Sequence, residues 1–206
     1  MTGFSALLVG LGLGLRHALD ADHVVVVSTM LQREPGFWRA ARIAALWGAG
    51  HSVAFLALGL MIVVAGLRVP EVFERGAQLL VAVMLVALGL WHLIRARPRT
   101  MADDEETVEL SPAARPIAIG LVHGLAGSAG IALLAATTIE SRALAVGYLF
   151  LVAIGTVVGM VALTALLAQP IRWTVHREGL LKRTVTVLAA LLGIGLGIRI
   201  FADTFA

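Results

Sequence analysis

The sequence has no cysteine and few charged residues. Without cysteine among its 206 residues, the chain has no disulfide, no thiolate ligand for a metal and no thiol nucleophile. Charged residues make up 14% of the chain, whereas a soluble globular domain has about 25%. Basic runs with interleaved aromatic residues are also missing, so we expect no nucleic-acid partner despite the formal charge of +3.

Two catalytic signatures are missing as well. The phosphate-binding pattern Gly-x4-Gly-Lys does not occur, so the chain supplies no ATPase of its own. The zinc-protease pattern His-Glu-x-x-His does not occur either, and no glutamate lies within the long apolar runs to act as a base beside a metal. We therefore predict that the protein is not an enzyme and that it has no resident cofactor.

Long apolar runs dominate what is present. Hydrophobic residues form 59% of the chain, and the mean hydropathy is +0.94. Runs close to the ~20 residues needed to cross a bilayer recur along the sequence. The predicted spans are 3–29, 42–66, 76–95, 116–138, 143–168 and 184–202. The sequence therefore predicts an all-α polytopic membrane protein with six transmembrane helices, surrounded by a lipid bilayer.

The two halves of the sequence repeat weakly. Residues 14–19 align with residues 120–125, and residues 89–90 align with residues 195–196 at the same offset. Each half holds three predicted spans, and an odd number of crossings turns the second half upside down relative to the first, as in many secondary transporters. The predicted units are a three-helix repeat at 1–95, a cytoplasmic linker at 96–115 and a second three-helix repeat at 116–206.

The basic residues predict the orientation in the membrane. Eleven of them lie on one side of the predicted spans, namely Arg33, Arg39, Arg42, Arg95, Arg97, Arg99, Arg115, Arg172, Arg177, Lys182 and Arg183. Four lie on the other side, namely Arg68, Arg75, Arg142 and Arg199. The positive-inside rule places the loops 31–42, 96–115 and 169–183 in the cytoplasm and both termini outside. The tryptophans Trp38, Trp47, Trp91 and Trp173 lie near the predicted cytoplasmic boundary and are interpreted as an interfacial belt.

A polar cluster interrupts the first predicted span. Residues 16–23 read Arg-His-Ala-Leu-Asp-Ala-Asp-His, within a segment that is otherwise apolar from Phe4 to Met30. One charge near the bilayer centre costs at least ~2.5–3.5 kcal/mol on insertion scales. Such a cluster therefore persists only where its groups pair with each other, bind an ion or line a wet cavity. Because histidine and aspartate suit Ni²⁺, Co²⁺ or Zn²⁺, we predict an intramembrane metal site.

Histidines in two other predicted spans lie at about the same depth in the membrane as this cluster. On regular helices, His51 and His123 lie in about the same layer of the membrane as the histidines of residues 16–23. A helix that unwinds near residues 20–22 would also present the carboxylates, and transporter helices often break at their sites. The candidate metal ligands are His17, Asp20, Asp22, His23, His51 and His123.

A purely structural interpretation of the cluster stays open. Arg16 and Asp20 are four residues apart and could form an ion pair. Residues 22–23 could cap the cytoplasmic end of the first span. His92, at the end of the third span, and His176, in a loop, do not join the cluster by depth and are interpreted as interfacial or solvated residues.

The same motifs resemble those of a known family. The run from Arg16 to Val24 resembles the signature helix of the nickel/cobalt transporter (NiCoT) family, His-x4-Asp-His, and residues 50–52, Gly-His-Ser, resemble the family's second motif. Together they cover about the first third of the chain. Residues 123–129 lack the carboxylates of the family's later motif. In this respect the chain is similar to short nickel-transport-like membrane proteins associated with urease maturation.

The resemblance implies high-affinity uptake of Ni²⁺ or Co²⁺ across the cytoplasmic membrane of a bacterium or archaeon. By that likeness His17, Asp22 and His23 carry the main roles in metal recognition, with Asp20 and His51 beside them. We therefore predict a six-helix permease whose transported substrate is a transition-metal ion, and a homo-oligomeric assembly is compatible with this prediction. The alternatives are a related nickel or cobalt efflux permease and a non-transporting intramembrane metal sensor.

Overall fold

The computed structural model describes residues 3–31, 37–67, 70–95, 113–125, 135–175 and 180–205. Within these ranges the secondary structure is helical and contains no strand, which confirms the all-α prediction for the described part of the chain. The helices are α1 (Gly3–His17), α2 (Ala21–Leu31), α3 (Phe37–Ala65), α4 (Glu71–Arg95), α5 (Ala114–Leu125), α7 (Arg142–Val175) and α8 (Leu180–Phe205).

Several of these helices have the length and composition of membrane spans. The helices α3, α4, α7 and α8 are each long and apolar enough to cross a bilayer, and α1 with α2 makes a fifth span if this bent pair is counted as one. Residues 126–134 of the predicted span 116–138 and residues 96–112 of the predicted linker lie outside the described residues. The helix α5 already begins at Ala114, within the range predicted as linker.

Large apolar side chains point outward from these helices. Leu166 of α7 is 73% exposed, and Ile94 of α4 and Leu192 of α8 are each 65% exposed. A soluble monomer rarely exposes apolar patches larger than a few hundred Å², whereas a bilayer solvates such side chains favourably. The outward-facing side chains therefore agree with the predicted membrane environment.

The turn between α3 and α4 follows from two residues. Gly66, directly after α3, has a positive φ of 65°, the backbone conformation in which glycine commonly ends a helix. Pro70 stands before α4, and its carbonyl accepts the backbone N–H groups of Phe73 and Glu74 at 2.9 and 3.2 Å. Proline suits this position because it has no N–H to leave unsatisfied at the start of a helix.

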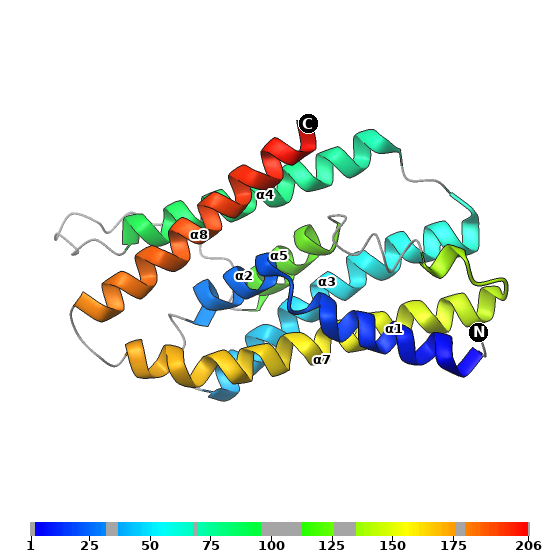
Figure 1. Cartoon of the computed structure of the whole chain (residues 1–206), viewed down its shortest axis with the longest axis horizontal. Coiled ribbons are helices and arrows are strands. Elements are labelled where there is room, and N and C mark those ends of the chain that lie inside the picture. The colour runs from blue at the N-terminus through cyan, green and yellow to red at the C-terminus, as the bar shows by residue number, and fades with distance from the viewer. Residues whose placement is uncertain are drawn as a thin grey trace.

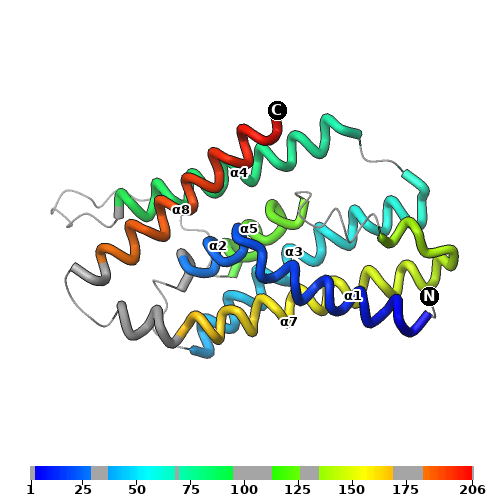
Figure 2. Tube along the Cα trace, viewed as in Figure 1, coloured from blue at the N-terminus to red at the C-terminus, as the bar shows by residue number. Residues whose placement is uncertain are grey.

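The helices pack in pairs that mix the two halves of the chain. The helix α1 lies along α7, α5 lies along α3, and α3 also packs against α7, while α4 and α8 form a pair of their own (Figure 1). The short helices α2 and α5 lie in the middle of the molecule, as the trace in Figure 2 shows, and α2 contacts both α8 and α7. Segments from both halves therefore surround the centre of the molecule.

Glycines at equivalent positions of the repeat permit α1 to approach α7 and α5 to approach α3 closely. A Cβ at Gly14 of α1 would overlap the backbone carbonyl of Val152 in α7. In the same way, a Cβ at Gly120 of α5 would overlap the carbonyl of Trp47 in α3. Gly14 and Gly120 are the two residues that the repeat aligns, so the same glycine makes the same kind of contact in each half.

The pair α4–α8 shows a similar reciprocity with a different register. A Cβ at Gly89 would lie 2.7 Å from the carbonyl oxygen of Ala190, and a Cβ at Gly197 would lie 2.7 Å from that of Ala82. The sequence alignment instead pairs Gly89 with Gly195, which faces open space. By their contacts, Gly89 therefore corresponds to Gly197, two residues after the glycine that the sequence alignment gives. The reason is that Gly197 lies on the side of α8 that faces α4.

Candidate metal centre

The first predicted span is broken beside the polar cluster. The helix α1 ends at His17, α2 begins at Ala21, and the two helices are bent by 51°. Within the break, the backbone N–H of Asp20 donates to the carbonyl of His17 at 3.0 Å. On an unbroken helix His17 and His23 would lie about 9 Å apart along the axis. The bend instead brings their ring centroids within 4.6 Å.

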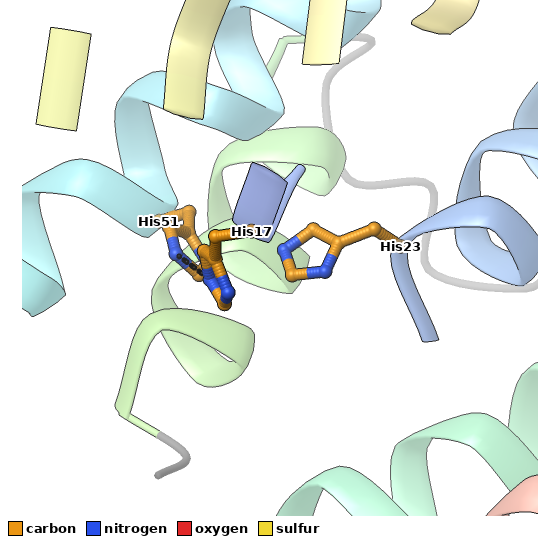
Figure 3. A group of neighbouring side chains, drawn as sticks. All are labelled: His17, His23 and His51. Atoms are coloured by element: carbon orange, nitrogen blue, oxygen red, sulfur yellow. Dashed lines mark hydrogen bonds between the residues drawn. The ribbon is translucent and has the colours of Figure 1, made fainter. Parts of the chain in front are cut away.

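His17 meets His51 of α3 through their ring nitrogens. The two Nε2 atoms lie 3.2 Å apart, and a dashed line marks this contact in Figure 3. The other nitrogen of His17, Nδ1, lies 2.9 Å from Asp20 Oδ2 and donates to it. When His17 is neutral, its Nε2 therefore carries the lone pair, and the Nε2–H of His51 donates to it. Both imidazoles are buried.

One carboxylate joins the other two histidines. Asp22 Oδ1 accepts the backbone N–H of His23 at 3.0 Å and the Nδ1–H of the same residue at 3.1 Å. Asp22 Oδ2 accepts the Nε2–H of His123 at 2.9 Å. Because His123 lies on α5, this carboxylate connects the break in the first span to the second half of the chain. Asp22 also lies in the first turn of α2, where the helix dipole favours a negative charge.

His23 lies between the pair His17–His51 and the pair Asp22–His123. Its Nδ1 faces Asp22, so its Nε2 points the opposite way, toward His17 and His51 (Figure 3). Ligand atoms of His17, His23 and His51 lie within 4.8 Å of one another, and so do ligand atoms of Asp22, His23 and His123. The centre therefore consists of two overlapping ligand groups that share His23.

Some buried ring nitrogens in this centre have no hydrogen-bond partner within the described ranges. They are His23 Nε2, His51 Nδ1 and His123 Nδ1. Buried polar atoms in folded proteins are almost always satisfied, and neutral imidazole is the most common protein ligand for metals. A set of imidazole nitrogens with adjoining carboxylates suits a borderline divalent cation such as Ni²⁺, Co²⁺ or Zn²⁺.

The structure brings all the predicted site residues into one region, although Asp20 has a different place from the rest. Its side chain is 42% exposed and bonds to His17, and it belongs to neither ligand group. Arg16 is exposed and is not the partner of Asp20 within the described chain. The alternative ion pair is therefore not formed, and residues 22–23 lie in the first turn of α2 instead of capping the cytoplasmic end of the span.

The remaining histidines lie elsewhere. His92 of α4 is buried, with 6% exposure, so of its two interpretations, interfacial or solvated, the solvated one is wrong, and it belongs to neither ligand group. The α4 face that carries it packs inward, which a position at the end of a predicted span does not reveal. His176 lies outside the described residues.

Trp47 is the residue of the centre that sequence reasoning missed. It is fully buried, with its ring centroid 5.3 Å from that of His23 and 6.0 Å from that of His123. The belt prediction is wrong for Trp47, because this face of α3 packs against α5, whereas Trp38 is 83% exposed. One signal could have found it: Trp47 precedes His51 by four residues and therefore lies on the same helix face.

Glycines on α5 set the distance between the two halves of the centre. A Cβ at Gly120 would overlap the carbonyl of Trp47, and a Cβ at Gly124 would overlap the carbonyl of His51. These glycines flank His123, which is fully buried. The close backbone approach that they permit places His123 beside the histidines of the first half.

The fold and the centre together define a class of protein. The described residues make an all-helical protein of the polytopic membrane type, with a cluster of buried imidazoles and adjoining carboxylates at the break in the first predicted span. This fold, and the relative described next, fit a protein that is not an enzyme.

Comparison with known proteins narrows the class. The chain is 29% identical over 177 residues to the urease accessory protein UreH of Bacillus sp. (strain TB-90), an alignment that covers 81% of this chain and 77% of that protein. It is also 27% and 26% identical to the chloroplast proteins FOR GROWTH AND FERTILITY 2 and 1 of Arabidopsis thaliana. These alignments cover 99% of this chain, which spans only 56% and 59% of the length of the two plant proteins. No protein-family model matches the chain, and no solved structure matches it.

Proposed function

We propose that the protein is a permease that takes up Ni²⁺ or Co²⁺ across the cytoplasmic membrane through the centre at the broken span. The observation that carries this proposal is the meeting of His17, His23 and His51. Metal–nitrogen bonds of about 2.0–2.1 Å place two imidazole ligands of one ion roughly 3 Å apart. The Nε2 atoms of His17 and His51 are separated by 3.2 Å, so little movement is needed for both to bind one cation.

The choice of metal is supported by the motif and by a relative. Residues 16–24 resemble the signature of the nickel/cobalt transporter family. The relative named urease accessory protein agrees with the likeness of this chain to short nickel-transport-like proteins associated with urease maturation. Imidazole ligands by themselves accept Ni²⁺, Co²⁺ and Zn²⁺. These two likenesses are the support for naming Ni²⁺ first in the proposal.

We further propose that the chain forms six spans arranged as a 3+3 inverted repeat, with repeats at 1–95 and 116–206. The proposal counts α1 with α2 as one span and residues 116–138 as another. The reciprocal contacts of Gly14 and Gly120 support it. Gly14 on the first helix of one half contacts α7, and Gly120 on the first helix of the other half contacts α3, so each glycine meets the second span of the opposite half. In such transporters the site lies at the interface between the repeats, and here Asp22 bonds to His123 across that interface.

The proposed orientation puts both termini outside. Among the helix ends next to the basic loops, the C-terminal ends of α4 and α7 and the beginning of α8 lie together at the left end of Figure 1. This grouping supports a common cytoplasmic side under the positive-inside rule. An inside-negative potential then drives a dication inward, by up to about 4.6 kcal/mol per 100 mV, from ~2.3 kcal/mol per charge.

Flux into liposomes tests the proposal. The purified full chain would be reconstituted, and the uptake of Ni²⁺, Co²⁺, Zn²⁺ and Mn²⁺ measured with an inside-negative potential. We expect uptake of Ni²⁺ or Co²⁺ that His51→Ala removes and that His92→Ala, which alters a buried histidine outside both ligand groups, retains. Metal binding without flux would contradict the permease and favour a sensor. Flux that occurs only when the potential drives the cation out of the side assigned to the cytoplasm would contradict uptake.

A further inference from the structure

We propose that the centre holds its cation in two successive positions and that His23 belongs to both. The first, the three-histidine position, is formed by His17, His23 and His51. The second, the carboxylate position, is formed by Asp22, His23 and His123. This inference rests on the proposed function, because successive positions matter for a cation that passes through the protein.

The two nitrogens of His23 carry the argument. Nδ1 lies 3.1 Å from Asp22 Oδ1, on the side of the carboxylate position. Nε2 is buried, has no hydrogen-bond partner within the described chain, and points toward His17 and His51 (Figure 3). A cation in the three-histidine position therefore uses Nε2, while a cation in the carboxylate position uses Nδ1. One ring serves both positions without moving to a different part of the protein.

The ring proton of neutral His23 must change nitrogen when the cation changes position. With the cation on Nε2, the proton stays on Nδ1 and the bond to Asp22 is kept. With the cation on Nδ1, the proton must sit on Nε2. The Nε2 lone pairs of His17 and His51 can accept it when His51 carries its own proton on Nδ1, which is buried without a partner within the described residues. His123 has the same freedom, because its Nδ1 is buried without a partner within the described residues. Its proton can therefore move to Nδ1 and leave Nε2 for the cation.

The two positions cannot be filled at the same time. They share the ring of His23, and a neutral imidazole that binds a cation through one nitrogen keeps its proton on the other. Two dications bound to one ring would also repel each other strongly in a site removed from water. The proposal therefore requires one cation per chain, although the ligand atoms would suffice for two.

The positions also differ in charge. The three-histidine position offers imidazole ligands only, with Asp20 bonded to the far side of His17. The carboxylate position contains Asp22, which otherwise accepts bonds from His23 and His123. Removing His51 should therefore affect the first position, and removing His123 the second. A single site built from all the ligands would respond to the two substitutions in the same way.

Co²⁺ provides a probe for both binding and transport. Its visible absorption depends on whether the ligands are all nitrogen or include oxygen, and it can be counted by elemental analysis. The full chain in detergent should bind one Co²⁺. We expect His123→Gln, whose side-chain N–H can still donate to Asp22, to keep the Co²⁺ affinity within about threefold of the unaltered protein. Its flux in liposomes should nevertheless fall at least tenfold. His51→Ala should lower the affinity at least tenfold and shift the spectrum toward oxygen ligation.

The control variant is His92→Ala, which should change neither Co²⁺ binding in detergent nor flux in liposomes. Equal losses of affinity in His51→Ala and His123→Gln, or two Co²⁺ bound per chain, would overturn the two positions. Unaltered flux in His123→Gln would also overturn them and would assign the bond between Asp22 and His123 a structural role. Absence of flux in the unaltered protein would instead refute the permease, while the affinities and spectra would still decide between one position and two.

Discussion

The Nε2 atoms of His17 and His51 lie 3.2 Å apart, although 34 positions separate the two residues in the sequence. The contact joins the end of α1 to the middle of α3, directly beside the break in the first span. His23, on the far side of that break, completes a ligand group with them. Metal binding at this centre therefore depends on the break in the first span and on the glycines that let the helices approach.

Removing either histidine of the first span should abolish metal uptake. We expect His17→Ala and His23→Ala cells to accumulate no radioactive nickel above background, because each substitution deletes one of three ligands from the group. The amount of protein in the membrane fraction should remain the same, as measured by immunoblotting. Uptake at the normal rate in both variants would refute their assigned role.

Neutralising Asp22 should weaken metal binding. Its carboxylate holds the rings of His23 and His123, and loss of such a supporting group typically costs about 10–100-fold in metal affinity. Asp22→Asn also turns one acceptor into a donor that faces an N–H group. The Kd for Ni²⁺ of the purified variant measures the effect. Asp203→Asn, which alters an exposed carboxylate paired with Arg199 on α8, should leave the Kd unchanged.

Filling Gly14 should destabilise the protein, whereas filling Gly12 should not. A side chain at Gly14 would collide with the backbone of α7, while Gly12 has no neighbour within 4 Å. Forcing extra atoms into a close contact costs about 1–3 kcal/mol or more. Gly14→Val should therefore lower the midpoint of thermal unfolding in detergent relative to Gly12→Val, which carries the same change in helix propensity. Equal midpoints would show that α1 does not approach α7 this closely.

Trp47 should report metal binding by its fluorescence. Its ring lies 5.3 Å from that of His23, and paramagnetic Ni²⁺ or Co²⁺ quenches a nearby indole. Titrating the unaltered protein with Ni²⁺ should quench part of the emission, and Trp47→Phe should remove most of that quenching. Trp38→Phe, at an exposed position on the same helix, is the matched control. Quenching that persists in Trp47→Phe would place the cation away from this centre.

Several features could be read from the sequence because they depend on composition and spacing. Helical spans follow from apolar runs of about the bilayer thickness. The cost of burying charged groups in such a run singled out residues 16–23, and helical depth added His51 and His123 to the same layer. Depth could not place His92, which is buried on α4 outside both ligand groups.

Other features depend on contacts between helices. The bend of 51° after His17 decides which atoms of residues 17–23 face one another, and hydropathy does not reveal a bend. The inward position of Trp47 follows from the crossing of α3 and α5. The correspondence of Gly89 with Gly197, in place of Gly195, follows from which side of α8 faces α4.

The sequence by itself determined the class of elements and the residues that carry polar chemistry in an apolar setting, because both follow from the free energy of transferring side chains out of water. Only the tertiary structure decided which nitrogen of each imidazole faces which partner and that the ligands divide into two groups sharing His23. These relations depend on a break in a helix and on glycine-mediated backbone contacts, which are set by the fit between helices far apart in the chain.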